Sequence, residues 1–149
     1  MAIGTDSAVE FFGTQDKITG SGGTVVDGAF GAAATTWTND DDAPMASIVL
    51  EVTYSSAPDA NSSVNLYARP LDIQSTNDGG VPDANFGHVY LGSFPLNDVT
   101  SAQYIAIDIR LPNTKTSQEY NFYIENNGGQ TISPTWDLYV TPKTIGPHA

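Results

Sequence analysis

The chain of 149 residues has no cysteine, which excludes disulfides, thiolate metal sites and cysteine nucleophiles. It is also poor in positive charge, because five basic residues stand against 17 acidic ones and leave a formal net charge of −12. Affinity for nucleic acids and for anionic membranes depends largely on Lys and Arg. We therefore expect neither nucleic acid nor a membrane as a partner. The sequence has no apolar run near the roughly 18 residues of a membrane-spanning helix.

The first residues lack the features of a secretory signal. MAIGTDSAVEFFG contains no basic residue and no long apolar stretch, so we expect no signal peptide and synthesis in the cytoplasm. The absence of cysteine agrees with a reducing compartment. A chain of this length can bury a core without disulfides or metals.

Six segments between residues 46 and 141 alternate apolar and polar side chains with the period of half-buried strands. They are ASIVLEVTY (46–54), SVNLYAR (63–69), HVYLGSF (88–94), AQYIAIDI (102–109), EYNFYIE (119–125) and WDLYVT (136–141). Turns rich in Pro, Gly, Asn and Asp separate them. The pattern predicts an all-β fold, an antiparallel β-sandwich of jelly-roll type, with an immunoglobulin-like sandwich as the alternative.

Residues 1–45 differ in composition from the body, residues 46–149. The stretch KITGSGGTVVDGAFGAAATT (17–36) consists mostly of small residues, which pack a core poorly. We expect an extended N-terminal arm with short strands near 24–26 and 35–38, held by Trp37 as its large anchor. On this interpretation, deletion of residues 1–34 leaves a folded body.

Several aromatic residues fall outside the main apolar stripes. Strict alternation in segment 88–94 places Tyr90 and Phe94 on one side of the strand and Val89 and Leu91 on the other. The tyrosines opposite the apolar stripes of the other segments are Tyr67, Tyr104, Tyr123 and Tyr139. On an open sheet face they form a stacking platform for sugar rings or a protein interface, and on a covered face they are buried.

The sequence shows no gathered set of catalytic side chains. His88 stands at the start of a predicted strand, where a surface or edge position is expected, and His148 is the penultimate residue. Most acids of the strands lie opposite the apolar face, the ordinary solvent-facing position. We therefore predict a protein that is not an enzyme, with no catalytic residues and no cofactor.

Two acidic loops contain oxygen ligands of the kind that Ca²⁺ prefers, residues 39–42 and residues 72–83. The second resembles an EF-hand loop only loosely, because Gln74 and Thr76 replace acids and Asp83 replaces the closing Glu. Acidic turns are more often simply solvated, so we assign no metal site.

Three phrases give the chain a resemblance to virion structural proteins of tailed bacteriophages. They are the strand end LYARP (66–70), the loop VPDAN (81–85) and the ending W-x-L-x-V-T-P (136–142), within a similarity that covers about residues 37–144. The closest resemblance is to capsid decoration, or cement, proteins. It implies a non-enzymatic β-sandwich on the capsid exterior that binds the major capsid protein, often as a homotrimer. A head-fibre, tail or adaptor component of the virion and a carbohydrate-binding β-sandwich module are the alternatives.

For this role the apolar residues of the arm are the candidate contacts with the capsid. The longest loop, residues 71–87, is the second candidate, because long loops in compact domains are often functional. The predicted partner-binding residues are Phe11, Phe12, Val25, Val26, Phe30, Asp78, Asp83 and Phe86.

Overall fold

A computed structural model describes residues 7–85 and 89–147, and these residues form strands, turns and loops. The strands are β1 (Ala8–Phe12), β2 (Asp16–Thr19), β3 (Phe30–Ala32), β4 (Trp37–Thr38), β5 (Met45–Val52), β6 (Ser63–Pro70), β7 (Tyr90–Pro95), β8 (Gln103–Arg110), β9 (Glu119–Asn127) and β10 (Asp137–Pro147). Among the described residues, no helix is long and apolar enough to cross a membrane.

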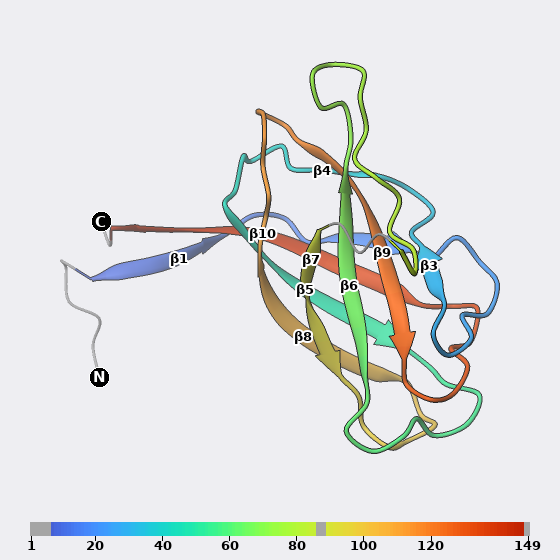
Figure 1. Ribbon diagram of the computed structural model, residues 1–149. Helices are drawn as coiled ribbons and strands as arrows, with labels where there is room; N and C mark the ends of the chain where they lie inside the picture. Colours follow the sequence, from blue (N-terminus) through green and yellow to red (C-terminus); the bar gives the residue numbers. More distant parts are fainter. Residues whose placement is uncertain (1–6, 86–88, 148–149) are drawn as a thin grey trace.

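The strands form two antiparallel sheets that pack face to face (Figure 1). One sheet has the order β1-β10-β5-β8, with β2 also pairing with β10, and the other has the order β3-β9-β6-β7, with β4 also pairing with β9. The chain changes sheets at every connection from β2 onward except β3–β4 and β6–β7. This order is that of a jelly roll, and it confirms the predicted β-sandwich.

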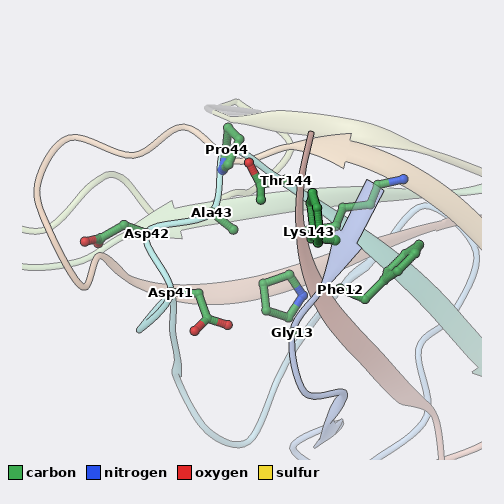
Figure 2. Close-up of a pocket in the computed structure, with 10 residues that line it drawn as sticks. Phe12, Gly13, Asp41, Asp42, Ala43, Pro44, Lys143 and Thr144 are labelled. Atoms are coloured by element: carbon green, nitrogen blue, oxygen red, sulfur yellow. The ribbon is translucent and has the colours of Figure 1, made fainter. Parts of the chain in front are cut away.

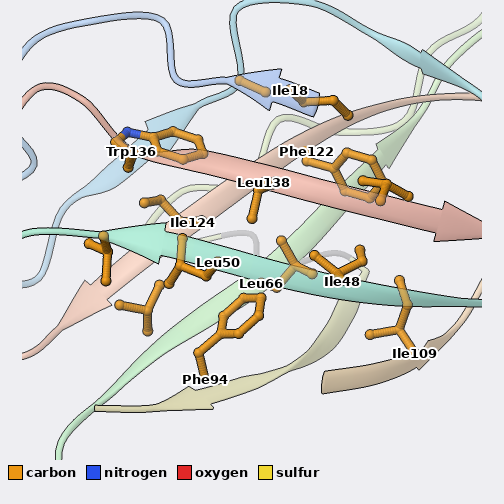
Figure 3. Close-up of a cluster of buried hydrophobic side chains, with 14 of the residues drawn as sticks. Ile18, Ile48, Leu50, Leu66, Phe94, Ile109, Phe122, Ile124, Trp136 and Leu138 are labelled. Atoms are coloured by element: carbon orange, nitrogen blue, oxygen red, sulfur yellow. The ribbon is translucent and has the colours of Figure 1, made fainter. Parts of the chain in front are cut away.

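The core lies between the sheets and follows from the two-residue period of the strands. Burial alternates strictly along β5 and β6, because successive side chains of a strand point to opposite faces. Alternation predicts one buried apolar stripe in each of these strands, for example Ile48, Leu50 and Val52 in β5, and these side chains are buried in the structure. Figure 3 shows several of the buried side chains. The core includes Ile48, Leu50, Val52, Val64, Leu66, Phe94, Ile109, Tyr120, Phe122, Ile124, Trp136, Leu138 and Val140.

The segment before residue 46 supplies outer strands to both sheets. In it, β2 pairs with β10, and β3 and β4 pair with β9. Ile18, Val25 and Trp37 are buried, and the Trp37 ring stacks on Tyr120 at 6.2 Å between centroids. Trp37 is thus the anchor that the sequence predicts. Because of this packing we now expect that removal of residues 1–34 unfolds the body, in place of the expectation from the sequence that the body stays folded.

A β-bulge changes the direction of the side chains in β7. Leu66 pairs with Gly92 and Tyr67 pairs with Tyr90, so β7 carries one residue more than the facing stretch of β6. Phe94 is consequently buried, whereas Tyr90 is 56% exposed on the outer face. The expectation that Tyr90 and Phe94 share a side is wrong, because alternation alone does not anticipate the extra residue.

Buried tyrosines make the fold sensitive to alkali. Burial raises the pKa of Tyr54 and of Tyr120 far above the ordinary value. The folded protein thus keeps the phenol proton to a higher pH than the unfolded chain, in which the tyrosine pKa is near 10. The unfolding free energy is therefore unaffected by these groups below about pH 10 and falls as the pH rises above that value. Between pH 8 and pH 11 we expect the wild type to lose about 1.4 kcal/mol more unfolding free energy than Tyr120→Phe. Urea titrations at the two pH values measure this difference, and equal losses in both proteins would contradict it.

Candidate interaction surfaces

A two-stranded ribbon extends away from the sandwich (Figure 1). It consists of β1 and the second half of β10, paired in register from Ala8 opposite Pro147 to Phe12 opposite Lys143. The first half of β10 lies inside the sheet between β2 and β5. The ribbon is therefore a continuation of one sheet beyond the core.

Both faces of the ribbon carry exposed apolar side chains. Phe11 is 49% exposed on one face, and Phe12 and Ile145 are 61% and 54% exposed on the other. A two-stranded ribbon that is not covered by other elements is at best marginally stable in water. An exposed apolar edge of this kind is also a template for strand pairing with another chain. These features are typical of a surface that another molecule covers.

An open groove of about 280 Å³ lies where the ribbon joins the sandwich. Figure 2 shows Phe12 and Gly13 on one side of it and Asp41 on the other. The Asp41 carboxylate lies against Gly13, where a Cβ atom would collide with it. The groove thus combines an exposed aromatic ring with acidic side chains.

Lys143 fixes the base of the ribbon to the sheet. Its side chain is 4% exposed and its Nζ lies 2.9 Å from Asp108 of β8 and 3.1 Å from Glu10 of β1. The hydrogen bond to Asp108 raises the pKa of Lys143, and the bond to Glu10 adds to this effect. The Phe12 ring covers the same ammonium group at 5.9 Å from its centroid. These contacts hold β1 in one position relative to the sandwich.

The loop after β6 is tied down by Asp78. One carboxylate oxygen of Asp78 accepts a hydrogen bond from the backbone N–H of Asp72, and the other lies 3.4 Å from Arg69. The Arg69 Nε also donates to the carbonyl of Gly79 at 2.8 Å. Asp78 therefore has a structural role in the loop.

The residues predicted to bind a partner fall in different environments. Phe11 and Phe12 lie together on the ribbon, and Val26 is 54% exposed in a separate loop. Val25 is 5% exposed, because its backbone forms a bridge with Ile132 that points its side chain into the core. Val25 therefore offers almost no exposed apolar area to a partner. Phe30 lies on the outer face of the second sheet. Asp83 is exposed, and its carboxylate accepts a hydrogen bond from the N–H of Asn85. Phe86 lies outside the described residues.

The outward tyrosines separate into two groups on opposite sides of the sandwich. Tyr104 and Tyr139 lie on the outer face of the first sheet, and both donate hydrogen bonds to Glu51. Tyr67 and the 8% exposed Tyr123 pair across β6 and β9 in the second sheet. Two further rings lie beside Tyr67: Phe30 at 5.6 Å and Tyr90 at 5.8 Å between centroids. Sequence reasoning did not place Tyr90 in this group because of the bulge in β7.

The acidic side chains serve as hydrogen-bond acceptors in these surfaces. Bonds from Tyr139 and Tyr104 lower the pKa of Glu51, so it stays a carboxylate, the opposite of what a general acid needs.

In the acidic turn at residues 39–42, Asp42 accepts the N–H of Ser117, and Asn39 is buried and bonded to Ala43. Within residues 7–85 and 89–147, no three His, Asp or Glu side chains gather as metal ligands do. His88 and His148 lie outside the described residues.

Comparison with known proteins gives distant likenesses. No known family and no curated protein matches the chain. An arabinose-bound α-L-arabinofuranosidase matches with a TM-score of 0.43 and 11% identity over 80% of this chain and 18% of the other. A structure of carbohydrate-binding modules of the β-sandwich superfamily matches with a TM-score of 0.38 and 11% identity over 95% and 57%. The chain thus spans less than two thirds of either protein, and likenesses this distant say nothing of its function.

Proposed function

We propose that this protein is a non-enzymatic structural component of a tailed-phage virion that decorates the capsid exterior. The observation that carries the proposal is the β1–β10 ribbon, with Phe11, Phe12 and Ile145 exposed outside the core. The ribbon binds the major capsid protein, and the sandwich remains on the outside of the shell. The short sequence segments that resemble decoration proteins, residues 66–70, 81–85 and 136–142, support the same role.

The protein acts as a homotrimer in this proposal. Three ribbons then contact neighbouring capsid subunits at once, and their combined attachment is much stronger than that of one ribbon. The net charge of −12 keeps the outer surfaces of neighbouring trimers apart. Light scattering on the purified protein measures the oligomeric state, and a monomer would contradict the trimer.

A ribbon variant tests the attachment. Replacement of both phenylalanines by serine, Phe11→Ser with Phe12→Ser, removes apolar area that is half exposed in the free protein. Burial of two half-exposed phenylalanines is worth about 2–3 kcal/mol, so we expect binding that is weaker by roughly 30- to 150-fold. Co-sedimentation with capsid shells that lack the decoration protein measures this loss.

Val26→Ser provides the control, because Val26 is equally exposed but lies away from the ribbon. It should bind shells as the wild type does. Wild-type affinity in the double variant would refute the role of the ribbon. An intact protein that binds no shell would refute capsid decoration itself.

A further inference from the structure

We propose that the outer face of the second sheet is a binding site for a neutral oligosaccharide. The site consists of the three rings Phe30, Tyr67 and Tyr90 with the polar residues Asn65, Ser93 and Glu125, and we call it the aromatic platform. Its residues come from strands β3, β6, β7 and β9, which pair side by side. This activity goes beyond capsid attachment and uses a different part of the surface from the ribbon.

The rings provide the stacking surface. Tyr90 is 56% exposed and packs edge-to-face on Tyr67, with an angle of 64° between the rings. Phe30 contacts Tyr67 from the other side. The apolar C–H face of a sugar ring packs on an aromatic face, and the tyrosine hydroxyl remains available for hydrogen bonds. Three rings in contact across the sheet offer such a surface in a fixed orientation.

A row of polar side chains runs beside the rings. Ser93 donates to Asn65 at 2.6 Å, and Asn65 in turn donates to Glu125 at 3.1 Å. The Tyr67 hydroxyl also donates to Glu125, at 2.8 Å, and the Tyr90 hydroxyl shares a hydrogen bond with Ser93. Burial, with the bond to Glu125, raises the pKa of Tyr67 to about 12, so this hydroxyl keeps its proton. The polar groups are thus held in place before a ligand arrives.

Glu125 offers the platform a hydrogen-bond acceptor for sugar hydroxyls. Within the described part of the chain, both hydrogen bonds to Glu125 end on Oε2, which leaves Oε1 for a ligand. On the opposite sheet, Tyr104 and Tyr139 occupy one oxygen each of Glu51. The two tyrosine clusters therefore differ in what they offer, although both lie on outer faces.

A groove continues from the platform at Ser93. It has a volume of about 500 Å³ and is lined by Asn61, Ser62, Ser63, Ser93, Pro95 and Leu96. This size lies within the range of small-molecule sites, roughly 300–1,000 Å³. Its lining is uncharged, and Glu125 is the charged member of the platform. These groups favour a hydroxyl-rich neutral ligand and disfavour an anionic one.

Calorimetry with cellohexaose, xylohexaose, maltohexaose and chitohexaose tests the proposal on the full chain. Tryptophan fluorescence does not report on this face, because Trp37 and Trp136 are 4% and 1% exposed. We expect binding of at least one of these oligosaccharides. Tyr90→Ala should weaken that binding at least about tenfold, whereas Tyr90→Phe keeps the ring and should stay within about threefold.

Tyr104→Ala is the matched control, because Tyr104 is 65% exposed on the opposite sheet. It should bind the oligosaccharide as the wild type does. Absence of binding to all four oligosaccharides would overturn the proposal, as would binding that Tyr104→Ala loses and Tyr90→Ala keeps. Attachment of Tyr90→Ala to capsid shells should remain normal, so failure of the platform and failure of capsid attachment are told apart.

Discussion

Deletion of residues 1–34 should unfold the protein, whereas deletion of residues 1–12 should leave it folded. The longer deletion removes β2 and β3, the edge strands of the two sheets, together with the buried side chains of Ile18 and Val25. Burial of these two side chains alone is worth about 3–6 kcal/mol, which is comparable with the whole stability of many domains. The deletion also uncovers Trp136, because Gly20 lies against the face of its ring.

Circular dichroism and urea denaturation of the two deletion variants measure this difference. The shorter deletion removes β1, whose side chains are largely exposed, and breaks the ion pair between Glu10 and Lys143. We expect it to cost at most about 2 kcal/mol, because most of the lost contacts are at the surface. A cooperative unfolding transition in the longer deletion with unchanged midpoint would show that the segment is an independent arm after all.

Asn126→Ala should destabilise the fold by about 3–5 kcal/mol, the second largest effect that we expect. The Asn126 side chain is fully buried, and its Nδ2 donates to the carbonyls of Val25 and Gln130. Its Oδ1 accepts hydrogen bonds from the Tyr54 hydroxyl and from the N–H of Gly128. Alanine leaves the Tyr54 hydroxyl, the Gly128 N–H and the Gln130 carbonyl without this partner, while the Val25 carbonyl keeps its bond from the Ile132 N–H. Each buried polar group left unpaired costs about 1–3 kcal/mol before relaxation.

The neighbouring Asn127 provides the control for this network. Asn127 is exposed at the end of β9, so Asn127→Ala should change the unfolding free energy by less than about 0.5 kcal/mol. Guanidinium denaturation of both variants gives the comparison. A loss below about 1 kcal/mol in Asn126→Ala would mean that water replaces the amide without cost, against the burial of the site.

The two proposed binding surfaces lie on different sheets. The ribbon continues the first sheet, while the aromatic platform covers the outer face of the second. A protein attached to a shell by the ribbon thus still has a second sheet for another ligand. The Phe11 and Phe12 double variant and the Tyr90 variant therefore test separate activities of one molecule.

The sequence by itself determined the main strands from Met45 onward and, except in β7, the sides that their core side chains face. Alternation places Tyr120, Phe122 and Ile124 inside, because a strand reverses its side chains at every residue. The turn at Gly128 and Gly129 was also predictable, and Gly129 adopts a positive φ of 76° that favours glycine. These features depend on local chemistry, which a single sequence contains.

Only the tertiary structure decided where the weakly patterned segment before residue 46 lies. Small residues give little strand signal, and pairing with β9 and β10 is a contact across about a hundred residues of chain. The exposure of Tyr90 depends on a β-bulge in β7, and this bulge arises only from the way β7 pairs with β6. The ribbon depends on the pairing of β1 with β10, and the aromatic platform depends on the pairing of β3, β9, β6 and β7. Both surfaces therefore join residues that are distant in sequence and adjacent across a sheet.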